Sequence, residues 1–515
     1  MPRNVADIKM RLQKKRDEKN KAATITVHDP VEQLALAMKY LFSEEKDEKK
    51  AVELLKSAVK QDCFPAQFQL GCCYYEGIGV ERDYTEANRL FTLAARQNFS
   101  PAQFYLGPSN YKAIGLKQNY SKAFELFRLS SNQDYIPAKC YLGLCYYEGH
   151  GVKKNYSEAF NLFSMAAKEN MVPAKFYLGR CYDQGHGVEQ NFSTAADLYA
   201  FAAAHNNIEA QFHLGCYYLK GIGVEQNFKK AAELFAAAAK SGDCKAQFYL
   251  AGCYTDGTGV EQNDKKATEF LMSAAEQNYP PAQYRLAFCY LEGKNLEQNT
   301  AEAMRLFKLS AEQGYPAAQN QLGAYYAEGT YVELNPAKAI SLFTLAAEQG
   351  QKSAQYNLAL SYFKGEVVPK NIAKAIELYT PLAIAGDANA QYDLASCYTT
   401  QKMTEQNIEK IFYFLDLAAK QGHARAEVGL GIFYLLHKRS LLKSFEEKNA
   451  LSEMEDLRVN PSSIEPSTIS PAEPNQIDDQ AGLASFQQIP DDKASQEAVR
   501  LFESAAEKGN SQANL

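Results

Sequence analysis

The sequence predicts an all-α protein: an α-α superhelix, or solenoid, of about twelve 36-residue helix hairpins. Two observations predict it, a strict period along the chain and a pair of apolar helical stripes within every period. Pro30 occupies the register of the first repeat, so twelve repeats begin between residues 30 and 426. In the following repeats an alanine recurs every 36 residues without insertion, at Ala66, Ala102, Ala138, Ala174, Ala210, Ala246, Ala282, Ala318, Ala354, Ala390 and Ala426.

Each repeat begins with a predicted helix that we call helix A. With the recurring alanine counted as position 0, Ala66, Leu70, Gly71 and Tyr74 fall on one stripe of a helix. The small residue beside the leucine lets another helix approach closely. A glycine at position 11 predicts the helix end, because glycine adopts the left-handed backbone of a C-cap without strain. This glycine is Gly77, Gly149, Gly185, Gly221, Gly257, Gly293, Gly329 and Gly365.

The second helix of each repeat, helix B, is predicted to begin after a side chain that caps free N–H groups. Glu86, Glu158 and Glu302 lie three residues after such caps, where a carboxylate closes a capping box. Leu90, Phe91 and their equivalents then form the buried stripe of helix B. The predicted caps are Asp83, Asn119, Asn155, Asn191, Asn227, Asn263, Asn299, Asn335, Asn371 and Asn407.

The loop between helix A and helix B contains a Gly-x-Gly pair in five repeats, as in "GIGVEQN" from Gly221. A glycine-rich loop before a helix can bind phosphate. This loop, however, lacks the Lys-Ser/Thr that a nucleotide-binding loop places after its glycines. Later in the chain Asn295, Tyr331, Val367 and Met403 replace the second glycine without changing the period. The loop is therefore predicted to be a hinge, and no cofactor is expected.

Composition narrows the function classes further. The chain has 515 residues, a net charge of −6 and a pI near 5.8, so it has no general attraction for nucleic acid, and a protein or peptide partner is expected. No run of 18 apolar residues predicts a transmembrane segment, and the N-terminus lacks the apolar core of a signal peptide, which predicts a cytoplasmic protein. Six of the eleven cysteines share one repeat register and are predicted to be small core residues in a reducing compartment: Cys73, Cys145, Cys181, Cys253, Cys289 and Cys397.

The repeated unit, typified by "AQFYLAGCYTDGTGVEQN" from residue 246, resembles the Sel1-like repeat family over roughly residues 30–437 and again at 493–515. The tetratricopeptide repeat is a weaker match, because it has a period of 34 and a tryptophan, and this chain has no tryptophan. The resemblance implies a non-catalytic adaptor or scaffold with a tetratricopeptide-like superhelix that binds proteins. Action as a bacterial effector inside a host cell is compatible with it.

The alternative is a hydrolase built on the same repeats. A secreted, cysteine-rich branch of the family is similar in repeat and carries a helix-pair disulfide in each repeat, and some of its members bind or hydrolyse β-lactams. This chain departs from that branch, because its cysteines are not paired within repeats and no signal peptide is visible. It also lacks a Gly-x-Ser-x-Gly elbow and a Ser-x-x-Lys with partner motifs, so no catalytic residue is assigned.

Position three of helix A varies while the core register repeats, so it is the candidate partner-binding position. A ladder of tyrosines there would combine contact area with a hydrogen-bonding tip, which suits a peptide-binding groove on the concave helix A surface. Packing between repeats is the alternative explanation. The candidate residues are Tyr105, Tyr141, Tyr177, His213, Tyr249 and Arg285.

Two irregularities give local predictions. Pro108 lies inside the helix A of its repeat and predicts a kink or a shortened helix, because proline removes a backbone hydrogen bond. His150 and His186 occupy the same loop position in adjacent repeats, so their rings could approach one another as the start of a metal site. The sequence offers no obvious third metal ligand beside these two histidines, and no metal is predicted.

The predicted organisation has four parts. Residues 1–29 form a basic N-terminal tail, and residues 30–437 form the repeat solenoid. Residues 438–492, rich in proline, serine and acidic residues, form an insertion in the last repeat that is expected to be disordered. Residues 493–515 form the final helix B and the start of a truncated repeat.

Overall fold

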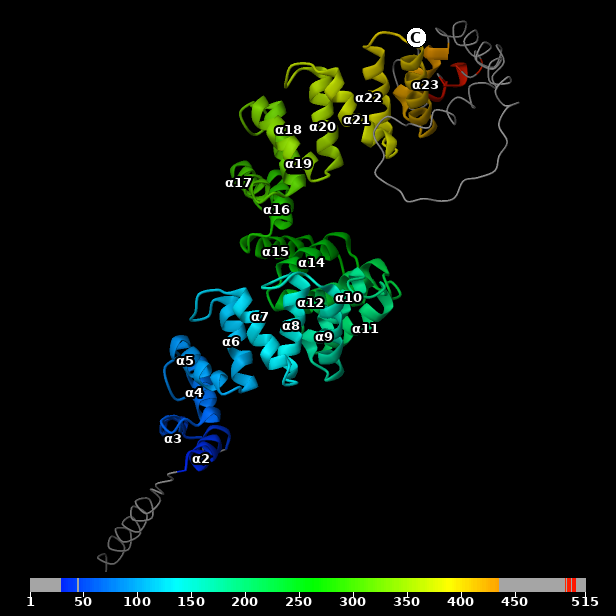
Figure 1. Ribbon diagram of the computed structural model, residues 1–515. Coiled ribbons are helices and arrows are strands. Elements are labelled where there is room, and N and C mark those ends of the chain that lie inside the picture. Colours follow the sequence, from blue (N-terminus) through cyan, green and yellow to red (C-terminus); the bar gives the residue numbers. More distant parts are fainter. Residues whose placement is uncertain (1–28, 44–45, 435–495, 497, 502, 506–515) are drawn as a thin grey trace, which may run out of the picture. The chain divides into compact units, whose positions relative to one another are not determined.

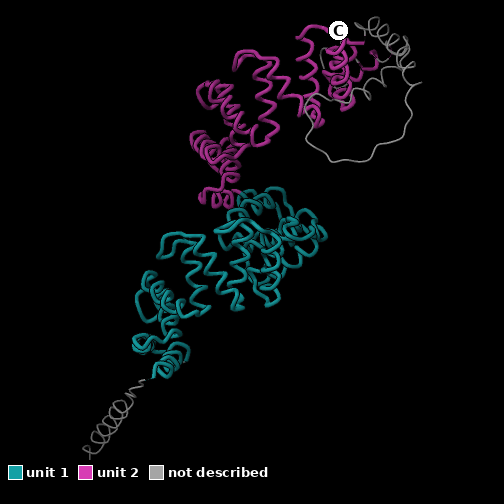
Figure 2. Tube along the Cα trace, in the orientation of Figure 1, with its two compact units in different colours: residues 1–267 teal, residues 268–515 magenta. Residues whose placement is uncertain are grey.

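The computed structural model describes residues 29–43, 46–434, 496, 498–501 and 503–505. Within these residues every regular element is an α-helix, and helix A and helix B alternate along the chain (Figure 1). The chain forms two compact units, unit 1 at residues 1–267 and unit 2 at residues 268–515 (Figure 2). The predicted N-terminal tail, except residue 29, the whole insertion and most of 493–515 lie outside the described residues. The α-α superhelix of helix hairpins is confirmed.

In unit 1 the even-numbered helices are A helices and the odd-numbered helices are B helices. Each helix contacts the helices before and after it in the sequence, as a stack of hairpins requires. The elements are α2 (Pro30–Phe42), α3 (Glu48–Val59), α4 (Phe64–Glu76), α5 (Tyr84–Arg96), α6 (Ser100–Lys112), α7 (Tyr120–Ser131), α8 (Ile136–Glu148), α9 (Tyr156–Lys168), α10 (Val172–Gln184), α11 (Phe192–Ala204), α12 (Ile208–Lys220), α13 (Phe228–Lys240) and α14 (Cys244–Asp256).

Helix α15 (Asp264–Glu276) carries the boundary between the two units. Unit 2 then repeats the alternation of helices and ends its described part with a helix at residues 424–434 and helical residues between 496 and 505. Its numbered elements are α16 (Pro280–Glu292), α17 (Thr300–Glu312), α18 (Pro316–Glu328), α19 (Pro336–Glu348), α20 (Lys352–Lys364), α21 (Ile372–Ile384), α22 (Ala388–Thr399) and α23 (Glu405–Lys420).

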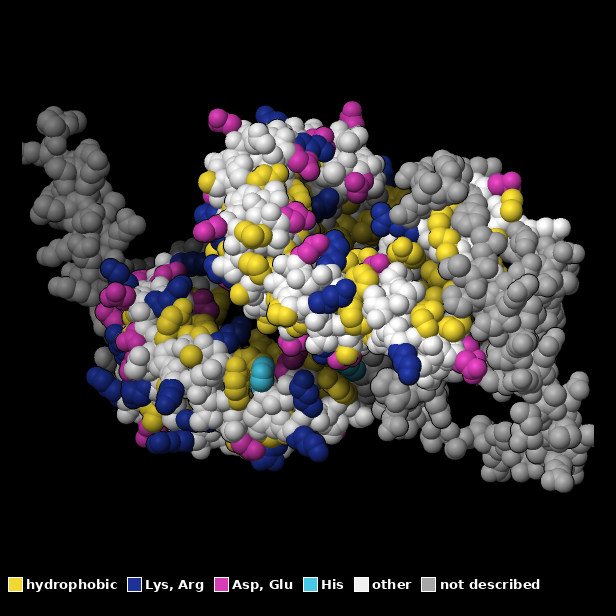
Figure 3. Space-filling model, turned by 90° about the horizontal axis from the view of Figure 1, so that it is seen from above, with side chains coloured by type: hydrophobic (Ala, Val, Ile, Leu, Met, Phe, Trp, Pro, Cys, Tyr) yellow, Lys and Arg dark blue, Asp and Glu magenta, His cyan; other side chains and the backbone are white. Residues whose placement is uncertain are grey.

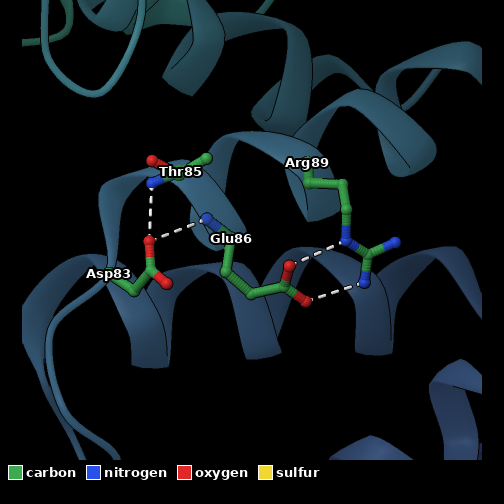
Figure 4. Close-up of polar contacts among 4 residues, drawn as sticks. All are labelled: Asp83, Thr85, Glu86 and Arg89. Carbon is green, nitrogen blue, oxygen red and sulfur yellow. Dashed lines mark hydrogen bonds and ion pairs between the residues drawn. The ribbon is translucent and has the colours of Figure 1, made fainter.

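The ends of the helices are where the sequence placed them in almost every repeat. Helix α4 ends at Gly77, whose φ of 79° is left-handed and whose N–H donates to the Cys73 carbonyl at 2.8 Å. Helix α5 begins after Asp83, whose carboxylate accepts the N–H groups of Thr85 and Glu86 at 2.9 and 3.0 Å (Figure 4). The predicted C-caps and N-caps are therefore confirmed in these helices.

The predicted capping box is wrong in one half. The Asp83 N–H does not donate to the Glu86 carboxylate. It donates to the Tyr74 carbonyl of helix A at 2.9 Å. The Glu86 carboxylate instead pairs with Arg89 at 2.7 Å (Figure 4). The cap N–H groups of Asn155 and Asn299 likewise donate to helix A carbonyls. Tertiary contact between the two helices thus replaces the local reciprocal bond.

The predicted cap Asn407 is also wrong. Helix α23 begins at Glu405, and its N-cap is Thr404, whose hydroxyl accepts the Asn407 N–H at 3.3 Å. The Asn407 side chain donates to the Lys402 carbonyl at 2.8 Å. Threonine is also an N-cap residue, and with Thr404 as the cap this helix begins three residues earlier and gains about one turn.

Pro108 does not shorten its helix. Helix α6 has 13 residues and continues through Pro108 to Lys112, like α4. Asn110 is buried there, and its side chain donates to the Leu106 carbonyl at 2.8 Å. The predicted shortening is therefore wrong. Packing of the buried face of α6 stabilises the helix despite the backbone hydrogen bond that proline removes.

The Gly-x-Gly loop packs each repeat of unit 1 against the one before it. Gly151 has a φ of 77°, and a Cβ there would lie 2.3 Å from the Tyr120 carbonyl oxygen at the start of the preceding helix B. The N–H groups of Gly149 and His150 donate to the Cys145 carbonyl at 2.8 and 3.0 Å. Both donors are thus used to end helix A.

The core of each repeat lies between its two helices. Gly107 and its equivalents lie where a Cβ would overlap the aromatic ring of helix B, and for Gly107 that ring is Phe127. Glutamines tie the start of helix A to the end of helix B, as in the Gln133–Gln103 bond of 2.8 Å. The cysteines of the shared register are free thiols, buried except for the half-buried Cys289, so the core prediction is confirmed.

Candidate functional site

The position-three residues are half-buried and pack between repeats. We call the five in unit 1 the ladder: Tyr105, Tyr141, Tyr177, His213 and Tyr249. Each ladder ring lies against the aromatic ring of the preceding helix B, in the pairs Tyr105–Phe91 (5.4 Å), Tyr141–Phe127 (5.2 Å), Tyr177–Phe163 (5.2 Å), His213–Tyr199 (5.3 Å) and Tyr249–Phe235 (5.4 Å) between centroids. Arg285 is half-buried on α16 in unit 2 and is not part of this ladder. Packing between repeats is thus one role of the ladder, and its residues remain partly accessible.

A groove of about 260 Å³ opens on the helix A side of unit 1. It brings together two ladder residues, Tyr141 and Tyr177, whereas Tyr105, His213 and Tyr249 lie outside its lining. All lining residues come from A helices or their N-caps. They are Tyr111 and Lys112 of α6, Cys140, Tyr141 and Leu144 of α8, Pro173, Phe176 and Tyr177 of α10, and Asn207 and Glu209 at the start of α12.

Sequence reasoning missed several residues of this groove. Tyr111 lies at position nine, on a different helix face from position three, whereas Pro173 and Glu209 lie at position minus one, four residues before position three and on the same face. Curvature of the stack brings the end of α6 and the start of α12 into one lining. A period read along a single helix carries no information on that curvature.

The tyrosine hydroxyls of the groove are neutral hydrogen-bonding groups. Burial raises the pKa of Tyr141 and of Tyr177 above the usual value for tyrosine. Tyr111 has its pKa raised further by burial, and its hydroxyl bonds Nδ1 of His150 at 2.6 Å. The ionic groups of the lining, Lys112 and Glu209, are exposed. Acidic and basic side chains are likewise interspersed with apolar ones over the surface in Figure 3.

The two loop histidines are joined to tyrosines of the preceding repeat. The His150 ring stacks on Tyr120 at 4.4 Å, and the His186 ring stacks on Tyr156 at 3.9 Å. Nδ1 of His186 also lies 3.0 Å from the Tyr147 hydroxyl. In the described part of the chain, no group of three or more His, Cys, Asp or Glu side chains could hold a metal ion. The histidines act as links between repeats.

Two half-buried carboxylates, Asp183 and Asp393, accept hydrogen bonds from tyrosines of neighbouring repeats. Asp183 accepts a hydrogen bond from the Tyr217 hydroxyl, and Asp393 accepts one from the Tyr356 hydroxyl at 2.5 Å. Burial raises the pKa of Asp393 above its usual range. Neither carboxylate lines the groove of unit 1.

The family model for the Sel1 repeat matches most of the chain. The chain belongs to the Sel1 repeat family. Sel1 repeat proteins mediate protein–protein interaction, and their solenoid is typically a non-catalytic scaffold. The matches cover residues 33–63, 65–99, 100–135, 136–171, 172–207, 208–243, 244–279, 280–315, 316–351, 352–387, 388–423 and 482–510.

Solved structures of the family are similar to this chain. A protective antigen of uropathogenic Escherichia coli strains, which displays an SLR fold, is 28% identical with a TM-score of 0.64, covering 88% of this chain and 99% of its own. A Sel1 repeat protein from Oxalobacter formigenes is 30% identical with a TM-score of 0.44, covering 47% and 96%. No curated protein is similar enough to match. None of the described helices combines the length and apolarity needed to cross a membrane.

Proposed function

We propose that this Sel1 repeat protein is a non-catalytic adaptor that holds an extended segment of a partner protein in the groove of unit 1. The observation that carries the proposal is the convergence of four A helices on one groove, with the half-buried Tyr141 and Tyr177 in its lining. Position three was a candidate from its sequence variation alone, and the groove adds a place where two such residues act together.

The packing behind the two tyrosines favours binding. The Tyr177 ring stacks on Phe163 with an interplanar angle of 14°, and the Tyr141 ring lies on Phe127 at 31°. Rings held in this way lose little conformational freedom when a partner arrives, so more of the contact energy appears as affinity. Tyrosine is also among the residues most enriched at binding hot spots.

The chemistry of the groove favours an adaptor over the alternative of a β-lactam or other hydrolase. Its one cysteine, Cys140, is buried, and burial raises the pKa of that thiol to about 12. A thiol that stays protonated at neutral pH is a weak nucleophile. Neutral tyrosines, one lysine and one glutamate are a composition suited to binding.

The test is quantitative partner capture with paired variants. A Tyr141→Ser/Tyr177→Ser variant is expected to lose a partner that the wild type retains, while circular dichroism shows the same helix content. The matched control is Tyr218→Ser/Tyr254→Ser, since those rings lie outside the groove under Lys230 and Lys266 of the helix B side. Equal loss in both variants, or retention in the groove variant, would overturn the proposal. Extracts of the source cell and of a host cell, used side by side, test the effector role.

A further inference from the structure

We infer that the groove of unit 1 recognises a polyproline II segment with prolines three residues apart, an acidic residue facing Lys112 and a basic residue facing Glu209. This inference deepens the proposed function and rests on it. It is carried by the aromatic lining, by the contact between successive A helices, and by the two charges of the lining.

The lining has the chemistry of a proline-binding surface. Tyr111, Tyr141, Phe176 and Tyr177 are aromatic, and Pro173 lies exposed among them. Grooves lined by aromatic rings recognise proline-rich segments, because the proline ring packs on the apolar surface of an aromatic ring. A polyproline II backbone has no internal hydrogen bonds, so its carbonyls accept from tyrosine hydroxyls. Tyrosine hydroxyls are protonated at neutral pH and are able to donate in this way.

The spacing of the repeats matches the pitch of polyproline II. Tyr141 and Tyr177 lie at the same position of α8 and α10, which are in direct contact. Axes of packed helices are about 8–10 Å apart. A polyproline II segment advances about 9 Å per turn of three residues. Successive prolines at positions i and i+3 can therefore meet Tyr141 and Tyr177 in turn.

The two charges give the segment a direction. Lys112 is the last residue of α6, Glu209 is the second residue of α12, and both are exposed at the groove. Opposite charges on two different elements of one groove complement a segment that is acidic towards one end and basic towards the other. Because a polyproline II helix presents similar surfaces in both chain directions, charge decides which direction binds.

The test uses fluorescence anisotropy of labelled twelve-residue peptides with the full chain. One peptide carries prolines at i and i+3 between an aspartate at its N-terminal side and an arginine at its C-terminal side. A second has the two charges exchanged, and a third has the same composition with the prolines adjacent. We expect one of the two charge orders to bind about tenfold tighter than the other and than the adjacent-proline peptide.

Exchanging the protein's charges sharpens the test. The Lys112→Glu/Glu209→Lys variant is expected to reverse the preferred charge order of the peptide, an effect that general unfolding cannot produce. Tyr141→Ser/Tyr177→Ser is expected to weaken both charge orders about tenfold or more, whereas Tyr218→Ser/Tyr254→Ser keeps wild-type affinity. Equal affinity for all three peptides, or a preference that the charge exchange leaves unchanged, would overturn the inference.

A random-peptide display selection on the same protein separates the two levels of proposal. Selected peptides that need Tyr141 and Tyr177 but show no proline period would overturn the polyproline II inference and leave the adaptor function standing. If no selected peptide depends on those tyrosines, both fail. Enrichment of a Pro-x-x-Pro period among groove-dependent peptides would support both.

Discussion

Unit 1 and unit 2 are built from the same helix hairpin, yet they differ at two positions in each repeat. In unit 1 the position of the second loop glycine is glycine in every repeat from Gly79 to Gly259, whereas unit 2 has Asn295, Tyr331 and Val367 there. Position three is aromatic or histidine from Tyr105 to Tyr249, and polar in unit 2. The same core pattern recurs in both units, so the differences at these two positions reflect requirements other than core packing within a repeat.

The loop difference has a steric cause. In unit 1 the second glycine lies against the start of the preceding helix B, where a Cβ of Gly187 would be 2.3 Å from the Tyr156 carbonyl oxygen. In unit 2 the left-handed backbone persists without glycine at Asn295 (φ 58°) and Tyr331 (φ 62°), but not at Val367. At this loop position glycine is therefore required by a backbone contact in unit 1, whereas unit 2 accommodates a side chain there.

The largest expected effect tests this approach. Gly151→Ala or Gly187→Ala should lower the free energy of unfolding by about 3 kcal/mol, because alanine adds a clash with backbone to a strained left-handed conformation. Asn295→Ala in unit 2, at a site that already carries a Cβ, should cost about 1 kcal/mol. Thermal denaturation of the three variants measures the difference. Equal shifts in melting temperature would contradict the steric explanation.

A smaller effect is expected at position five of helix A. A Cβ on Gly107 would lie 2.0 Å from the Phe127 ring, so Gly107→Ala should cost about 2 kcal/mol through overpacking. Alanine occurs at this position elsewhere in the chain, as at Ala287 of unit 2, which is buried in a repeat whose helix B carries the buried Phe307. Urea denaturation of Gly107→Ala against Ala287→Gly compares the two sites. A neutral Gly107→Ala would show that helix A can move away from helix B in unit 1.

The next prediction concerns the helix cap in Figure 4. Asp83→Ala should cost about 1 kcal/mol, because two backbone N–H groups lose their acceptor. Glu86→Ala should cost about 0.5 kcal/mol or less, since its carboxylate pairs with exposed Arg89 and not with the cap. Hydrogen exchange of the first turn of α5 measures both. A larger loss in Glu86→Ala would restore the capping box.

The smallest effect expected is a pH dependence at His213, the one ladder residue that is not tyrosine. Burial, together with Arg180 and Lys245, lowers the pKa of His213, against the smaller opposing effects of Asp183 and Glu209. The folded chain then binds fewer protons than the unfolded chain below about pH 6.5, so stability falls as the pH drops through this range. His213→Tyr should flatten the acid side of a plot of melting temperature against pH. An unchanged slope would assign the acid sensitivity to other groups.

The sequence predicted the period, the helix ends and the buried stripes because all three depend on contacts that recur in every repeat. It failed where a contact links two helices or two repeats. The Asp83 N–H bonds to a carbonyl of helix A, and helix α6 continues through Pro108. The His150 ring stacks on Tyr120 of the preceding repeat. The groove also depends on contacts between repeats, which the sequence did not predict. Tyr141 was visible as a ladder residue, but its meeting with Tyr111 and Glu209 depends on the curvature of the stack.

The central claim is that partner binding belongs to the groove of unit 1, and photo-crosslinking tests it most directly. A photoreactive phenylalanine analogue is placed at Pro173, in the groove, or at Ala317, the same repeat position in unit 2. We predict one partner adduct from position 173 that Tyr141→Ser/Tyr177→Ser abolishes, and a much weaker adduct from position 317. Equal adducts from the two positions, or an adduct at 173 that survives loss of both tyrosines, would contradict the claim.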